Sequence, residues 1–190
     1  HPDVIEIWNI VFIQFSCSKN GKLNLLPTVH VDTGMGFERL SMIMQGVSST
    51  YDTDIFKNLI KHISSKADYI YGKEEKKDIA IRVIVDHIRA ISFSIADGQL
   101  PSNVKAGYVI RRILRRAVRY GYNFLGMRGP FLYDLVPVLC DQFKSSFPEL
   151  LSQKDLLIHV IKEEETSFLK TLEGGLRRIN QLISVSNSNI

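Results

Sequence analysis

The chain has 190 residues, of which 45% are apolar and 23% charged, and a formal net charge of +4. This length fits one large domain or two small ones, and the composition is typical of a folded protein rather than a disordered one. No run of about 18 apolar residues occurs, so we expect no transmembrane helix. The opening residues, HPDVIEIW, lack an initiator methionine and the two regions of a signal peptide, which favours a piece of a longer protein.

The sequence contains two cysteines, Cys17 and Cys140, which are far apart and outside any CxxC pattern. This usage favours reduced thiols in an intracellular protein and predicts neither a disulfide framework nor a zinc site.

Residues 5–46 predict a β-hairpin followed by a short helix. Residues 5–15 are rich in β-branched and aromatic side chains, and the odd-numbered positions, including Asn9 and Val11, share one face of a strand. Asn20-Gly21 is a strong hairpin signal. It predicts a second strand over 25–33, with an irregularity near Pro27. A helix is expected over 36–45, with Gly46 as its C-terminal stop.

From about residue 56 the apolar pattern becomes helical. Helices are predicted over 55–64, 77–96, 105–121, 131–143 and 153–184.

Several local signals refine these helices. Asp52 or Thr53 is the expected N-cap of the helix that begins near 55. Ser152 and Asp155 resemble a capping box at the start of the last helix. The pair Gly174-Gly175 is expected to weaken or bend that helix. Residues 184–190 are expected to be frayed or disordered.

The basic excess is confined to one predicted helix. Between Val104 and Tyr120 the sequence has six cations and no acid: Lys105, Arg111, Arg112, Arg115, Arg116 and Arg119. The rest of the chain therefore has a net negative charge, which points to a local site for a polyanion.

A helical projection places the five arginines on one side of this helix. The opposite side is apolar and carries Val109, Ile110, Ile113, Leu114, Ala117 and Val118. Nucleic-acid phosphate is the favoured partner. The alternative is a solvated face, or ion pairs with acids such as Glu163, Glu164 and Glu165. Membrane binding is disfavoured because the apolar side has no tryptophan or phenylalanine anchor.

Asn103 precedes this helix in a turn. It either caps the turn or helix, or uses its amide to read a base edge.

The stretch VDTGMGFERL, from Val31 to Leu40, raises a different question about charge. It places Arg39 in the first turn of a helix, where the helix dipole attracts acids. A cation is unfavourable there unless an anion binds beside it. The stretch therefore predicts an anionic ligand.

Five segments resemble alanyl-tRNA synthetases and occur in the same order: EIWNIVFIQF, VDTGMGFERL, YDTDIF, DHIRA and ADGQLPSNVKAGYVIRRILRRAVRYG. EEETSFLKTLEGGL resembles the family's next helix more loosely. VDTGMGFER resembles motif 3 of class II synthetases, whereas PSN…GYVIRRILRRAVRYG is specific to this family. The resemblance implies an α+β fold. Residues 1–60 would be the C-terminal part of an antiparallel-sheet catalytic domain, and residues 61–190 a helical tRNA-binding domain.

The resemblance also implies roles for residues in the hairpin and the short helix. Arg39 would bind the phosphates of ATP, which enters with Mg²⁺, and Gly36 and Gly34 would keep side chains away from ligands. Asp32 would pair with the ammonium group of alanine, and Asn9 and Val11 would line the alanine pocket together with Gly34.

In the basic segment, Asn103 would help to read the G·U pair in the acceptor stem of alanine tRNA, with the arginines on its phosphates. The whole enzyme would activate alanine with ATP and transfer it to the tRNA 3′ end. Nothing in the sequence resembles class II motifs 1 and 2, so we expect this chain alone to be inactive. We expect a cytoplasmic protein, with an organellar form as the alternative, and the oligomeric state stays open.

Each assignment has a plainer alternative. Asp32 would only cap the following helix, Asn9 would only bond to backbone, and Gly34 and Gly36 would only serve a turn. His87 in DHIRA is expected to be structural. For the chain as a whole, the alternatives are a non-catalytic RNA-binding relative and a module that binds an acidic protein.

Overall fold

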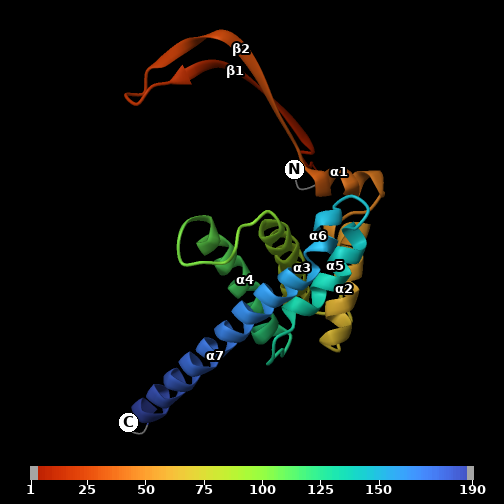
Figure 1. Cartoon of the computed structure of the whole chain (residues 1–190), viewed down its shortest axis with the longest axis vertical. Coiled ribbons are helices and arrows are strands. Elements are labelled where there is room, and N and C mark those ends of the chain that lie inside the picture. The colour runs from red at the N-terminus through yellow and green to blue at the C-terminus, as the bar shows by residue number, and fades with distance from the viewer. Residues whose placement is uncertain (1–3, 188–190) are drawn as a thin grey trace. The chain divides into compact units, whose positions relative to one another are not determined.

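The computed structural model describes residues 4–187 and has an α+β structure (Figure 1). The chain divides into two units, one that ends at Ile55 and one that begins at Phe56. None of the described helices has an apolar stretch long enough to cross a bilayer.

The first unit begins with the predicted hairpin. Strands β1 (Trp8–Cys17) and β2 (Leu23–Met35) pair antiparallel, and the turn between them uses a positive φ of 80° at Gly21. The register shifts between the pairs Ile13↔His30 and Phe15↔Leu25. Pro27 lies in the segment that this shift leaves out of register. Since proline has no N–H to donate to a ladder, the predicted irregularity is confirmed.

A short helix follows the hairpin as predicted. Helix α1 spans Phe37–Met44, and Gly46 has a positive φ of 63° just beyond it. The 3₁₀ helix η1 (Thr50–Asp52) then leads into α2 (Asp54–Lys66). Of the two expected caps, Thr53 rather than Asp52 occupies the position directly before α2.

The second unit is helical and packs around α3 (Glu75–Ala96). Helix α3 contacts α4 (Lys105–Phe124), η2 (Leu132–Leu135), α5 (Val136–Phe143), α6 (Pro148–Ser152) and α7 (Lys154–Asn187). Ile81, Ile84 and Ile88 of α3 have no exposed surface. Burial of each such side chain contributes about 1.5–3 kcal/mol, so α3 is the centre of the core.

The predicted helix over 131–143 is wrong as a single element. The structure has η2 and then α5, which begins with proline in its first turn. Pro137 has no N–H and clashes with a continuing upstream helix, so it belongs at a helix start. Helix α6, which also opens on a proline, was not predicted.

The predicted capping box is also wrong. Ser152 is the last residue of α6, and its hydroxyl donates to the Glu149 carbonyl at 2.9 Å. Helix α7 passes through Gly174 and Gly175 without a break, and Figure 1 shows it as one straight helix. It continues to Asn187, so fraying from residue 184 is not observed, and residues 188–190 lie outside the described part.

Both cysteines are free thiols, as predicted. Cys17 is exposed at the end of β1, whereas Cys140 is buried in α5 and its Sγ donates to the Leu150 carbonyl at 3.2 Å. Burial raises the pKa of the Cys140 thiol.

Candidate functional site

The hairpin register brings together the four residues to which the family resemblance gives a role in alanine binding. Asn9 pairs with Gly34, and Val11 pairs with Asp32. Residues two apart on a strand share a face, and directly opposed residues on antiparallel strands share the same face. All four positions therefore lie on one face of the hairpin.

Asn9 is bonded within the chain at both ends of its amide. Its Oδ1 accepts the Gly34 N–H at 3.2 Å, and its Nδ2 donates to Glu6 Oε1 at 3.0 Å. The alternative in which this amide bonds to backbone is thus observed. Each end of the amide thus has one partner within the chain, and each has capacity for one more.

Neither Gly34 nor Gly36 has a positive φ, so the backbone conformation does not require glycine at either position. A Cβ at Gly34 would lie 3.3 Å from Asn9 Oδ1, and a Cβ at Gly36 would lie 3.3 Å from Cδ of Arg39. Both distances are tight. Each glycine therefore leaves room for one polar side chain of the candidate site.

Asp32 is exposed and does not cap α1. The N-cap of α1 is Gly36, which receives no side-chain bond, while Asp32 Oδ1 accepts the Thr33 N–H at 2.9 Å. Within residues 4–187, the other carboxylate oxygen of Asp32 has no hydrogen-bond partner. A carboxylate in this state can accept from a ligand's cation.

Arg39 lies in the first turn of α1, as predicted, and its Nη1 donates to the Glu6 carbonyl at 2.6 Å. Glu6 thus contacts both Arg39 and Asn9, through its backbone and its side chain. Among the residues that the structure describes, no carboxylate forms an ion pair with Arg39. The predicted need for an external anion therefore still stands.

The arginines of α4 fall into two groups. Arg112, Arg116 and Arg119 are exposed and have no carboxylate partner in the described part of the chain. Arg111 and Arg115 instead form ion pairs with Glu164 of α7. The alternative of pairing with distant acids is therefore correct for two of the five.

The opposite side of α4 packs into the core only in part. Ile110, Leu114, Ala117 and Val118 are buried, but Ile113 is only half-buried and Val109 is 54% exposed. Val109 lies at the edge of the apolar side in the helical projection, beside Arg116. Its predicted burial is wrong because the core does not reach that edge.

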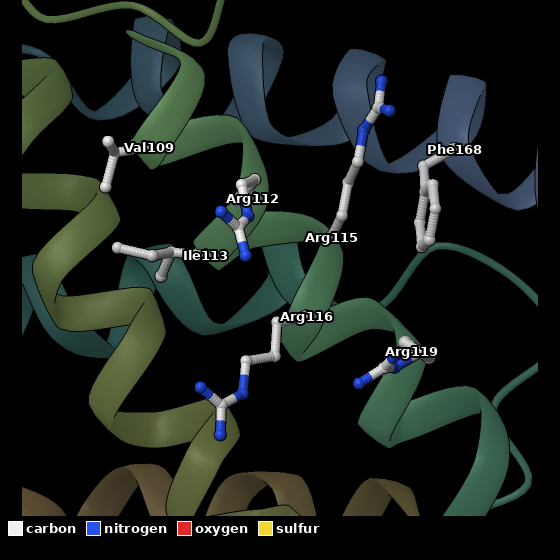
Figure 2. A pocket seen from close by; sticks show the side chains of 7 residues that line it. All are labelled: Val109, Arg112, Ile113, Arg115, Arg116, Arg119 and Phe168. Atoms are coloured by element: carbon white, nitrogen blue, oxygen red, sulfur yellow. The ribbon is translucent and has the colours of Figure 1, made fainter. Parts of the chain in front are cut away.

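A hollow of about 380 Å³ lies along the arginine side of α4. It is lined by Val109, Arg112, Ile113, Arg115, Arg116, Arg119 and Phe168. Figure 2 shows Arg115 reaching toward α7 and Arg112 and Arg116 pointing away from it. Four of its seven lining residues are cations, so the hollow is suited to an anion.

Three of these arginines make cation–π contacts with aromatic rings. Arg112 lies over Tyr108 and Arg116 over Tyr120, with 5.7 and 5.8 Å from guanidinium carbon to ring centroid. Arg115 lies 5.3 Å over Phe168. Cation–π contacts stabilise a guanidinium without neutralising it. The first two pairs were not predicted, although each joins residues four apart on one helix and is therefore visible in the sequence.

Asn103 is not a helix cap. Val104 is the N-cap of α4, and the Ser102 hydroxyl makes the local turn bonds by accepting from Val104 N–H and donating to the Val104 carbonyl. Asn103 Oδ1 instead accepts from Nη1 of Arg111. Asn103 is an exposed residue, and its Nδ2 has no partner within the described range.

The turn before α4 is tightly packed. Lys105 has a positive φ of 51°, and a Cβ at Gly107 would lie 2.5 Å from the Leu100 carbonyl oxygen. Any side chain at Gly107 would push the backbone of this turn. The backbone of the segment that carries Asn103 therefore packs directly against the start of α4.

Glu165 was named in the sequence only as a possible arginine partner, but it has a different role. It has no exposed surface and accepts the N–H groups of Phe131 and Leu132 at 2.8 and 3.0 Å. Burial raises its pKa to about 7, against the opposing effect of these bonds. Glu165 stands in a row of buried apolar residues spaced by four, Leu157, Ile161 and Leu169, which is the signal that would have found it.

Neither His87 nor a cluster of metal-binding side chains adds a catalytic group among the described residues. His87 is half-buried, and its Nδ1 lies 3.2 Å from Asp86 Oδ2. No group of three His, Cys, Asp or Glu side chains in residues 4–187 is arranged to hold a metal ion.

Comparison with known proteins gives a family match over the whole chain. Residues 1–190 match the family described as tRNA synthetases class II (A). The chain is 59% identical over 189 residues to the Alanine--tRNA ligase of Bacteroides fragilis and 61% identical over 182 residues to that of Cytophaga hutchinsonii. These alignments cover 100% and 96% of this chain, but 22% and 21% of the relatives. The chain therefore spans about a fifth of their length, and the resemblance drawn from the sequence is confirmed.

Proposed function

Because the chain belongs to the class II (A) family of tRNA synthetases, we propose that it is the part of an alanine–tRNA ligase that carries motif 3 and the acceptor-stem contacts. Residues 1–60 would complete the catalytic domain, and residues 61–190 would form the tRNA-binding domain. The whole enzyme would join alanine to ATP as an adenylate and then transfer it to the 3′ end of alanine tRNA.

The observation that carries the proposal is the pairing of Asn9 with Gly34 and of Val11 with Asp32 on one hairpin face. On this face, the carboxylate oxygen of Asp32 that has no partner among the described residues would bind the α-ammonium group of alanine. Val11 and Gly34 would lie beside it. A charge-assisted bond from ammonium to Asp32 would contribute roughly 1.5–3 kcal/mol. Val11 and Gly34 leave space for a methyl side chain.

Arg39 would contact the phosphates of ATP. A guanidinium donates in pairs and keeps its charge at any working pH, so it suits phosphate better than an ammonium does. Its role would be to hold the triphosphate in line and to stabilise the charge that develops there. Mg²⁺ enters the proposal only with ATP, because the described residues offer no ligand cluster for it.

The arginine side of α4 would bind the phosphates of the acceptor stem, and Asn103 would contact a base edge. Three exposed arginines without a carboxylate partner among residues 4–187 support the first role. The exposure of Asn103, whose Nδ2 has no partner in the same range, supports the second. RNA minor grooves are wide and shallow and display base edges, so an amide on a rigid turn can reach them.

A chimaera tests the proposed function. The matching 189-residue segment of the Bacteroides fragilis ligase would be replaced by this chain. We expect alanine-dependent aminoacylation of alanine tRNA that disappears when Asp32 and Arg39 are both replaced by alanine. A folded chimaera that binds tRNA but forms no alanyl adenylate would support the non-catalytic RNA-binding relative instead.

A further inference from the structure

We propose that Glu164 of α7 is a positioning residue for acceptor-stem specificity. It acts through Arg111 and fixes which end of the Asn103 amide faces the RNA. The inference rests on the proposed function and adds a residue from a different helix to the recognition of the stem.

Glu164 gathers two arginines on one oxygen. Its Oε1 accepts from Nε of Arg115 at 2.9 Å and lies 2.8 Å from Nη2 of the same residue. Nε of Arg111 lies 3.0 Å from the same oxygen as an ion pair. The Glu164 side chain is only 11% exposed, so these contacts are little screened by solvent.

Arg111 contacts both Glu164 and Asn103. Its Nη1 donates to Asn103 Oδ1, while its Nε lies within ion-pair distance of Glu164 without forming a hydrogen bond to it. One guanidinium thus joins the carboxylate of α7 to the amide in the turn before α4. The three groups form a chain from Glu164 through Arg111 to Asn103.

The chemistry of arginine sets the orientation of the amide. A guanidinium has donors and no acceptor, so the carboxamide must turn its oxygen toward Arg111. Nδ2 is then left without a partner among the described residues and can bind RNA. In this orientation Asn103 can only donate to RNA, and the base atom that it contacts must be an acceptor, such as a purine N3 or a pyrimidine O2.

Two residues next to Glu164 fix the position of α7 near Arg111 and Arg115. The neighbouring residue, Glu165, is buried and binds two backbone N–H groups at the start of η2. Phe168, one turn later, lies against Arg115. Glu164 therefore stays where Arg111 can reach both of its partners.

A simpler role for Glu164 would be to neutralise two arginines without affecting the amide. The two roles differ in what they predict. Charge neutralisation alone affects every RNA equally, whereas positioning affects the ratio of affinities for stems with and without the G·U pair.

The test compares Glu164→Gln with Glu163→Gln in the 190-residue chain. Glu163 is the exposed neighbour, and the change in charge is the same. Dissociation constants are measured at several salt concentrations for two acceptor-stem hairpin RNAs that differ only in a G·U or G·C pair. We expect Glu163→Gln to shift both constants equally and Glu164→Gln to reduce their ratio about 5-fold.

Asn103→Ala provides the second arm. It should bring the ratio of the two dissociation constants close to one. Adding Glu164→Gln to this variant should then not change the ratio further, because the carboxylate acts through the amide. Arg111→Lys keeps the charge but cannot contact both partners, so it should also reduce the ratio. It serves as the second variant if Glu164→Gln lowers the melting temperature.

The outcomes separate the two proposals. If Asn103→Ala abolishes the ratio while Glu164→Gln and Arg111→Lys leave it intact, the positioning role is wrong and the proposed function stands. If Asn103→Ala leaves the ratio intact, base recognition by Asn103 is wrong, and the role of Glu164 is wrong with it.

Discussion

Asn9 lies directly across the hairpin from Gly34, and its carboxamide oxygen accepts the Gly34 N–H at 3.2 Å. A Cβ at Gly34 would lie 3.3 Å from that oxygen, so a side chain there would require the Asn9 amide to shift by a few tenths of an ångström. The glycine and the amide therefore act as one unit on the face that we assign to alanine.

Gly34→Ala should weaken alanine binding in the chimaera. The added methyl group displaces the Asn9 amide by a few tenths of an ångström and costs one hydrogen bond of roughly 1 kcal/mol. We expect kcat/KM for alanine to fall about 5- to 10-fold while KM for ATP stays unchanged. Gly129→Ala is the control, because a Cβ at Gly129 meets nothing within 4 Å.

Asp32→Asn and Arg39→Ala should affect different substrates. Asp32→Asn removes a charge-assisted bond of roughly 1.5–3 kcal/mol, so kcat/KM for alanine should fall about 10- to 150-fold. Arg39→Ala should raise KM for ATP instead. Steady-state pyrophosphate exchange with each substrate varied in turn measures both effects. An Asp32→Asn variant impaired toward ATP and normal toward alanine would contradict the assignment.

Arg112→Ala and Arg116→Ala should weaken RNA binding without changing specificity. Both side chains are exposed and have no carboxylate partner among the described residues, so each is available to a phosphate. The slope of log K against log salt should become less steep by about 0.7–0.9 for each phosphate that the variant no longer neutralises. Lys19→Ala, which removes one charge from the hairpin, is the control. A variant with reduced affinity for only one of the two stems would show that its arginine contacts a base.

Glu165 should make the stability of the protein depend on pH. Its folded pKa is raised from 4.5 to about 7, mainly by burial, and Asp134 adds to the rise. The folded state therefore binds the proton more tightly than the unfolded state, and the resulting stabilisation is complete below pH 4.5 and disappears as pH rises through 7. As pH rises through this range, the free energy of unfolding of the unsubstituted protein should fall by about 3 kcal/mol at most relative to that of Glu165→Gln.

Urea unfolding of both proteins between about pH 4 and 8 measures this difference. Taking the difference between the two proteins removes the titration of all other groups. If their unfolding free energies stay parallel across this range, Glu165 does not titrate near pH 7.

Much of the fold could be predicted because local patterns determine it. The hairpin, α1, α3 and α4 follow from strand periodicity, Asn20-Gly21, Gly46 and the apolar rows of the helices. The split between η2 and α5 was missed although Pro137 marks it. The missed α6 is five residues long, and so short a helix depends on its packing rather than on its own periodicity.

The residues that we propose for the site could be named from the sequence and the family resemblance, but the contacts between them could not. Strand periodicity placed Asn9 and Val11 on one face, but only the register gives their partners across the hairpin. The helical projection of α4 separated the arginines from the core, but it places both Arg111 and Arg119 on the polar side and does not show that, of these two, only Arg111 has an ion-pair partner among the described residues. Their difference arises from Glu164, which is 53 residues further along than Arg111 and reaches it only through tertiary packing.

The two thiols differ enough to make the protein a one-site labelling target. Cys140 is buried, its Sγ is bonded to a carbonyl, and its raised thiol pKa leaves little of the reactive thiolate, whereas Cys17 is open to solvent at the end of β1. A maleimide dye should therefore modify the native protein once, at Cys17, and twice after denaturation. The single fluorophore would sit near the hairpin turn, about nine residues along the strand from Trp8, and could report on that hairpin without any engineered cysteine.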